Sequence, residues 1–168
     1  TPHSTTMPIP RLDLEHTALL VVDIQEKLLP HIHDHDQVVG KAEQLVQGFS
    51  SFGLPLLVTQ QYTKGLGPTV ASLAKHLPQE TVVQEKRKFS AYVRPVREQL
   101  AQWRVRCVVV CGIEAHVCVL QTCLDLIDGG YVTAVVADAI GSRHRGDRDV
   151  ALQRMTQWGV IPTTVEST

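Results

Sequence analysis

Six short runs of apolar, mostly β-branched residues recur along this chain, and segments with helical spacing of apolar residues separate them. The runs do not alternate apolar with polar residues, so each is predicted to be a strand buried on both faces. Repeated strand–helix units of this kind form a parallel sheet covered by helices on both sides. The predicted strands are residues 17–23, 54–59, 81–83, 105–111, 132–136 and 160–165. The expected fold is therefore a three-layer α/β, Rossmann-like sandwich.

The clearest helical pattern covers residues 38–49 and is followed by Gly53, and a second covers 150–158 and is followed by Gly159. Glycine is the residue most often found just past a helix end. Shorter helices are predicted at 68–77, 95–103 and 118–128. At 168 residues the chain is long enough for one good core. We expect a single domain over 11–168 after a flexible leader at 1–10.

The overall composition argues against several kinds of partner. The chain has 16 basic and 17 acidic residues, which gives no electrostatic reason to expect nucleic acid or an anionic membrane. The longest apolar runs, such as 18–22, are far too short to span a bilayer. All four cysteines fall between Cys107 and Cys123 without a Cys-x-x-Cys motif. A disulfide framework is not expected, and a reducing, cytoplasmic location fits better.

A cysteine follows the fourth predicted strand at a chemically favourable position. The strand breaks at Gly112, and Cys118 then falls in the first turn of the next predicted helix. The partial positive charge of a helix N-terminus favours a thiolate and lowers the pKa of a cysteine there. A lone cysteine is also commonly a small core residue. Cys118 is a candidate nucleophile whose pKa we expect to be lowered.

Two other strand ends carry candidate groups. Ligands of parallel α/β sheets bind outside the carboxyl ends of the strands, and Asp23 closes the first strand there. A partly buried aspartate can accept a proton, although it can also simply cap a turn. Lys86 and Lys88 follow the third strand, and either alone could be a surface charge.

Taken together, these residues resemble the isochorismatase-like cysteine hydrolase superfamily. Lys86 stands three residues before the aromatic that opens Phe-Ser-Ala-Tyr at 89–92, and Gly-Ile-Glu-Ala-His-Val-Cys-Val occupies 112–119. The resemblance covers residues from about Leu14 to Ser167, and segments 59–68 and 136–143 are most similar to isochorismatase domain-containing proteins. It implies a six-stranded parallel sheet of order 3-2-1-4-5-6.

The resemblance also implies a chemistry. Asp23, Lys86 and Cys118 correspond to the catalytic triad of that superfamily, which forms a thioester intermediate without a cofactor. A cis peptide between Ile113 and Glu114 would direct the N–H groups of Glu114 and Cys118 into an oxyanion hole. Relatives that cleave isochorismate have glycine in place of the cysteine. The retained Cys118 favours a small amide, ester or related carbonyl substrate.

The residues after the second strand bear on whether the site holds a metal ion. Metal-dependent nicotinamidases hold their ion with aspartate and histidine after the second strand, whereas this chain has Gln60, Gln61 and Tyr62 there. The histidine-rich segment 31–36 resembles a metal cluster only in composition, so no metal is expected. Asp138 and Arg143 are predicted to form an ion pair that fixes a loop. Candidates for the walls of the substrate pocket are Gln25, Leu28, Tyr62, Tyr92 and Ile113.

Two alternatives to a hydrolase remain open at this point: a catalytically vestigial interaction module, and a thiol redox sensor that uses Cys118. The superfamily commonly forms dimers or larger assemblies, so a homo-oligomer is expected, with Trp158 as one candidate contact residue.

Overall fold

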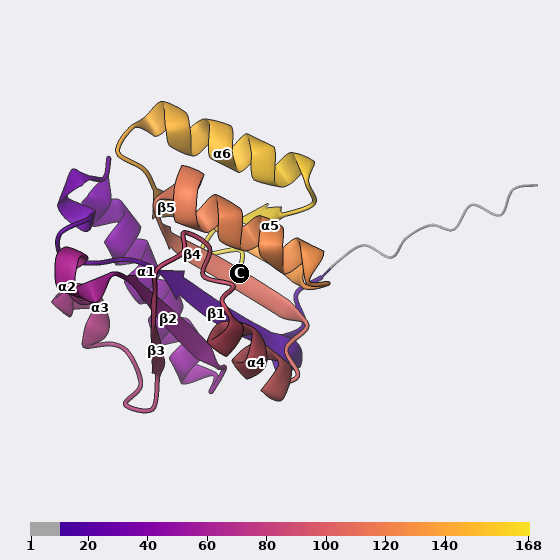
Figure 1. Cartoon of the computed structure of the whole chain (residues 1–168). Helices are drawn as coiled ribbons and strands as arrows, with labels where there is room; N and C mark the ends of the chain where they lie inside the picture. Colours follow the sequence, from indigo (N-terminus) through magenta and orange to yellow (C-terminus); the bar gives the residue numbers. More distant parts are fainter. Residues whose placement is uncertain (1–10) are drawn as a thin grey trace, which may run out of the picture.

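A six-stranded parallel sheet of order β3-β2-β1-β4-β5-β6 runs through the centre of the molecule (Figure 1). The computed structural model describes residues 11–168, so the leader expected at 1–10 lies outside the described residues. The strands are β1 (Thr17–Val22), β2 (Leu56–Gln61), β3 (Val82–Lys86), β4 (Cys107–Ile113), β5 (Val132–Gly141) and β6 (Ile161–Thr163). The α-helices are α1 (His35–Ser51), α2 (Thr63–Leu66), α3 (Ala71–Ala74), α4 (Arg94–Gln102), α5 (Leu120–Asp128) and α6 (Arg145–Gln157).

The two central strands are the most deeply buried elements. Every residue of β1 and β4 is buried. Successive side chains of a strand point to opposite faces, so Leu20 and Val22 enter one core cluster while Leu19 and Val21 enter the other. This double burial is the reason that these strands are apolar without interruption.

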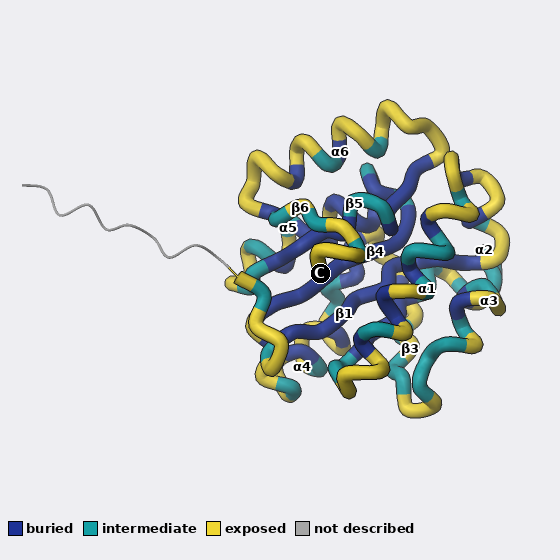
Figure 2. The backbone as a smooth tube through the Cα atoms, turned by 180° about the vertical axis from the view of Figure 1, so that it is seen from behind, coloured by how far each residue is buried: buried dark blue, intermediate teal, exposed yellow. Residues whose placement is uncertain are grey.

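Helices cover both faces of the sheet. The apolar stripe of α1 packs on one face through Val38, Ala42, Leu45, Val46 and Phe49. The buried residues of α4, α5 and α6 pack on the other face. In Figure 2 the central strands β1 and β4 are buried, whereas most of α6 is exposed. The predicted α/β sandwich and its strand order are confirmed. Among residues 11–168, no helix is long and apolar enough to cross a membrane.

The outer elements differ from the predicted ranges. β3 continues to Lys86, beyond the predicted end at residue 83, because an edge strand with one neighbour can include exposed polar residues. β5 continues to Gly141, past a register shift against β4. The helix expected at 68–77 is reduced to the single turn of α3.

The strand register brings several chain segments to one edge of the sheet. Val22, the last residue of β1, lies opposite Thr59 of β2 and Gly112 of β4. Gly112 has a φ of +132°, and a Cβ atom there would overlap the carbonyl group of Val22. Only glycine fits this position, where β1 and β4 leave the sheet together.

Candidate active site

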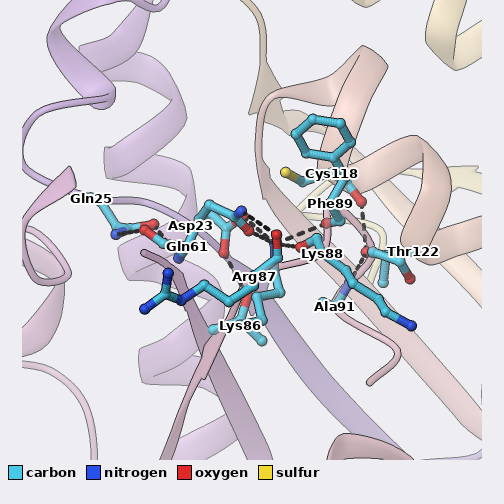
Figure 3. A network of polar contacts seen from close by, with 12 residues as sticks. Asp23, Gln25, Gln61, Lys86, Arg87, Lys88, Phe89, Ala91, Cys118 and Thr122 are labelled. Atoms are coloured by element: carbon cyan, nitrogen blue, oxygen red, sulfur yellow. Dashed lines mark hydrogen bonds and ion pairs between the residues drawn. The ribbon is translucent and has the colours of Figure 1, made fainter. Parts of the chain in front are cut away.

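A buried ion pair lies at the carboxyl edge of the sheet. Asp23 directly follows β1 with a φ of 54°, a left-handed conformation that aspartate tolerates better than most residues. The Nζ atom of Lys86 lies 2.7 Å from Oδ2 of Asp23, and both side chains are 0% exposed. Figure 3 shows the two side chains meeting, with Cys118 close by. Both charges are therefore removed from water.

Lys86 reaches Asp23 across the end of the intervening strand β2. It closes β3 opposite Gln61, and its Nζ atom also donates to Oε1 of Gln61 at 2.7 Å. The main-chain carbonyls of Lys88 and Phe89 accept from the same Nζ atom at 3.0 and 2.8 Å. A buried ammonium needs such partners, because an unsatisfied buried charge is costly. Of the two candidate lysines, Lys86 is the one that contacts Asp23.

Two hydroxyl groups complete the polar network, and sequence reasoning missed both. Thr59 donates its hydroxyl to Oδ1 of Asp23 at 2.9 Å. Thr122 donates to the carbonyl of Cys118 at 2.6 Å and accepts from the amide of Ala91 at 2.7 Å. Thr122 thereby ties the turn that carries Cys118 to the segment after Lys86. A signal was present, because a threonine four residues after another helical residue commonly bonds to its carbonyl.

Cys118 lies in a π-helical turn, Ala115–Val119, that leads directly into α5. The cysteine is 7% exposed. Burial raises the pKa of its thiol to about 12, and the negative charge of Asp23 adds to this effect while Lys86 opposes it. The lowered pKa predicted from the sequence is therefore wrong for this structure. At neutral pH the thiol keeps its proton, so a neighbouring base must remove that proton when the sulfur reacts.

The peptide bond between Ile113 and Glu114 is cis. The Glu114 carboxylate accepts from Nε of Arg143 at 2.9 Å. The predicted ion pair between Asp138 and Arg143 is wrong, because Arg143 extends from the end of β5 to Glu114. Asp138 instead lies 3.8 Å from Lys41 and accepts from the backbone amide of Val165.

Two of the predicted pocket residues have fully buried side chains. The Gln25 side chain is fully buried, and both its oxygen and its nitrogen bond to the backbone near Gln61 and Gly67. Ile113 is fully buried in the core beneath α1. The side chains of Asp23 and Lys86 are just as buried, so both pocket assignments stay predictions.

The other pocket candidates are partly accessible. Leu28 packs against the edge of the core on the α1 side. Tyr62 is 41% exposed. Tyr92 packs edge to face on Tyr131, with 6.0 Å between the ring centroids, and lines a groove beside the Asp23–Lys86 pair.

The histidine-rich segment does not form a ligand cluster. His33 lies 3.2 Å from Asp34, and His35 lies 3.1 Å from Asp36, so each contact joins sequence neighbours. Within residues 11–168, no group of three or more His, Cys, Asp or Glu side chains is arranged to hold a metal ion.

Comparison with known proteins places the chain in one family. The isochorismatase domain matches residues 17–167, and the chain belongs to that family. Isochorismatase domain-containing protein 2 of Xenopus laevis is 39% identical, over 97% of this chain and 78% of that protein's length.

Two solved structures are closely similar. The MAR1 ribonuclease of Caenorhabditis elegans is 39% identical with a TM-score of 0.90, covering 94% of this chain and 81% of that one. The Escherichia coli YcaC gene product, an octameric hydrolase of unknown specificity, is 26% identical with a TM-score of 0.87, covering 96% and 81%.

Proposed function

We propose that this protein is a cofactor-independent cysteine hydrolase that acts on a small amide, ester or related carbonyl compound. The observation that carries this proposal is the buried Asp23–Lys86 pair, whose charges both act on the Cys118 thiol. Removing two charges from water costs several kcal/mol per ion before their attraction is counted. A proton acceptor held at this cost beside a protonated thiol supports a catalytic role for the site.

In the proposed reaction, Asp23 takes the thiol proton as the Cys118 sulfur attacks the substrate carbonyl. Lys86 stays hydrogen-bonded to Asp23 and balances the charge. The amides of Glu114 and Cys118 stabilise the oxyanion. The tetrahedral intermediate collapses, and the departing amine or alcohol receives the proton from Asp23. Water then attacks the thioester, giving one proton to Asp23, and the acid leaves as the thiol is restored.

The direct test is a panel of para-nitrophenyl esters and anilides, followed by intact-protein mass spectrometry. The wild type should turn over part of the panel and gain the mass of one acyl group, and Cys118→Ala should do neither. A vestigial interaction module would show no acylation. A redox sensor would form a sulfenic acid at Cys118 with peroxide but would not acylate.

RNA is a second candidate substrate. The solved structure from C. elegans is that of a ribonuclease, and residues 86–97 of this chain contain five basic residues and no acidic one. A single-stranded RNA therefore belongs in the panel. Cleavage that survives in Cys118→Ala would contradict the thioester mechanism.

We also propose that the protein forms a homo-oligomer. The E. coli YcaC protein is octameric, and Trp158 of this chain is 65% exposed. Light scattering should give a mass above the 18.6 kDa of one chain. A value of one chain at working concentration would contradict the proposal.

We propose a cytoplasmic location because all four cysteines are unpaired thiols in the structure. Cell fractionation should recover the protein with cytosolic markers, and recovery from the medium would contradict this location.

A further inference from the structure

The basic residues of this chain are concentrated in one segment. Residues 86–97 contain five of the 16 basic residues and none of the 17 acidic ones. Lys86 is buried and engaged by Asp23. The other four side chains, Arg87, Lys88, Arg94 and Arg97, are exposed. The balanced charge of the whole chain hides this local excess.

All five basic residues line a single groove of about 670 Å³ between this segment and α5. The acidic residues that line it are Glu85 and Asp125. The charge of Lys86 is balanced by Asp23, but the other four basic residues still outnumber these two acidic ones, so the groove has a net positive charge. The groove volume lies within the range of pockets that bind small molecules.

The groove adjoins a second hollow whose wall includes Phe89, the residue drawn beside the candidate nucleophile. A second hollow of about 410 Å³ shares Arg87, Lys88 and Asp125 with the groove and adds Phe89 and Gln121. Gln121 belongs to α5, the helix that follows Cys118, and the carbonyl of Phe89 bonds to Lys86. In Figure 3 the Phe89 ring lies beside Cys118. The Phe89 ring thus lies between this hollow and the thiol, and a ligand in the groove would reach Cys118 past that ring.

Some of the cations are already oriented. The Arg97 guanidinium lies 5.6 Å from the ring centroid of Tyr92 and donates to the Tyr92 carbonyl at 3.1 Å. Arg87 lies 4.8 Å from the ring centroid of Tyr62. Arg94 pairs with Glu98 and Arg87 lies 4.0 Å from Glu85, whereas Lys88 and Arg97 have no ion-pair partner among the described residues. A guanidinium presents paired donors that match the oxygens of a carboxylate or phosphate.

We propose that the substrate of the Cys118 site is a small anion whose carboxylate or phosphate lies in this groove while its carbonyl group faces the thiol. This inference rests on the proposed hydrolase function and specifies its substrate class. The volume of the groove and the net charge of −1 favour a small molecule over a polyanion.

The first experiment compares two esters of equal length, para-nitrophenyl butyrate and the mono-para-nitrophenyl ester of succinic acid. In Lys88→Gln/Arg97→Gln, KM for the succinate ester should rise about tenfold with kcat unchanged, because only ground-state attraction is lost. Kinetics with the butyrate ester should not change. Lys75→Gln, an exposed lysine outside the groove, is the matched control. Equal effects on both esters would overturn the proposal.

A second experiment does not depend on hydrolysis. Cys118 is alkylated with iodoacetate, an anion, or with neutral iodoacetamide, and the ratio of the two rates is compared with that of glutathione. The wild type should favour iodoacetate, and the double variant should lose this preference. If neither ester is hydrolysed but the preference is present, the proposed function fails and the anion groove stands. If the preference is absent, the groove assignment is wrong.

Protection of Cys118 from iodoacetamide identifies the anion. Succinate and inorganic phosphate are the two probes. The one that protects at the lower concentration indicates whether the substrate carries a carboxylate or a phosphate. A short oligouridylate is the third probe. Protection by the oligouridylate that strengthens with its length, with neither small anion protecting, would overturn the small-anion proposal in favour of RNA.

Discussion

Asp23 and the histidine-rich segment 31–36 both follow β1, but the two polar clusters that they form differ in burial. Asp23 meets Lys86, a residue 63 positions away, and both side chains are 0% exposed. In the segment 31–36, the side chain of Asp34 is 65% exposed and that of Asp36 is 97% exposed, and each pairs only with an adjacent histidine. One cluster is assembled by the fold, whereas the other is a local surface feature.

The difference shows why composition is a poor guide to a reactive site. The histidine segment has more potential ligands, but water screens its charges and its contacts contribute little. The attraction between two unit charges grows severalfold as the effective dielectric constant falls. The Asp23–Lys86 pair has fewer groups, but it is removed from water and both of its charges act on the Cys118 thiol.

The largest expected effect comes from breaking the buried pair. Lys86→Met should leave the Asp23 carboxylate buried without its counter-charge, which costs about 3–5 kcal/mol of stability. Hydrolysis should fall by about a thousandfold or more, because the triad is proposed to act as a unit. Urea unfolding measures the stability and ester turnover measures the activity.

Lys88→Ala is the matched control for this prediction, because only its carbonyl contacts the ion pair. It should keep the wild-type stability and turnover of a neutral ester. Asp23→Asn/Lys86→Met should regain part of the lost stability without regaining activity. An active Lys86→Met together with an inactive Lys88→Ala would show that the catalytic lysine is misassigned.

A smaller effect concerns the protonation of Cys118. With a pKa of about 12, its alkylation by iodoacetamide should keep accelerating well above the value of about 8.5 for a free thiol. Asp23 raises this pKa, so Asp23→Asn should react faster near neutral pH although hydrolysis is lost. A rate that levels off at or below the ordinary thiol pKa would contradict the assigned burial.

The same shift predicts how stability depends on pH. The folded thiol holds its proton up to a pKa of about 12, whereas the unfolded thiol releases it at about 8.5. The contribution of this group to the free energy of unfolding is thus complete below the lower value and is lost as pH rises toward the upper one. Alkaline unfolding of the wild type and of Cys118→Ala measures this difference.

The smallest expected effect concerns the exposed cluster. His33→Ala/His35→Ala, and exhaustive treatment with a chelator, should each leave ester turnover and thermal unfolding unchanged. Loss of turnover on chelation, with recovery on adding zinc or manganese, would contradict this prediction and show that the reaction needs a metal ion.

The sequence predicted the centre of the fold better than its periphery. β1 and β4 are buried on both faces, so their apolar runs nearly match their boundaries. β3 lies at the edge, and its last residues include Glu85, which no apolar pattern could assign to a strand. The end of β5 depends on pairing with β4 after a register shift, which is a tertiary effect.

The site shows the same limit. Asp23, Lys86 and Cys118 were found through a family resemblance, and the structure brings them together. The direction of the Cys118 pKa shift was predicted wrongly, because the helix N-terminus is visible in a sequence and the depth of burial is not. The full burial of Gln25 and Ile113 could not be predicted for the same reason, since residues near a strand end can face the interior.

The way in which Lys86 is held has a consequence for how such a protein can diversify. Two of its partners are main-chain carbonyls, those of Lys88 and Phe89, and these oxygens are present whatever side chains stand at the two positions. Substitutions of Lys88 and Phe89 can change the shape of the hollow that they line, while the Lys86 ammonium keeps its two carbonyl partners. The backbone of this segment thus holds the Lys86 ammonium in place, and its side chains can change during evolution to suit a different substrate.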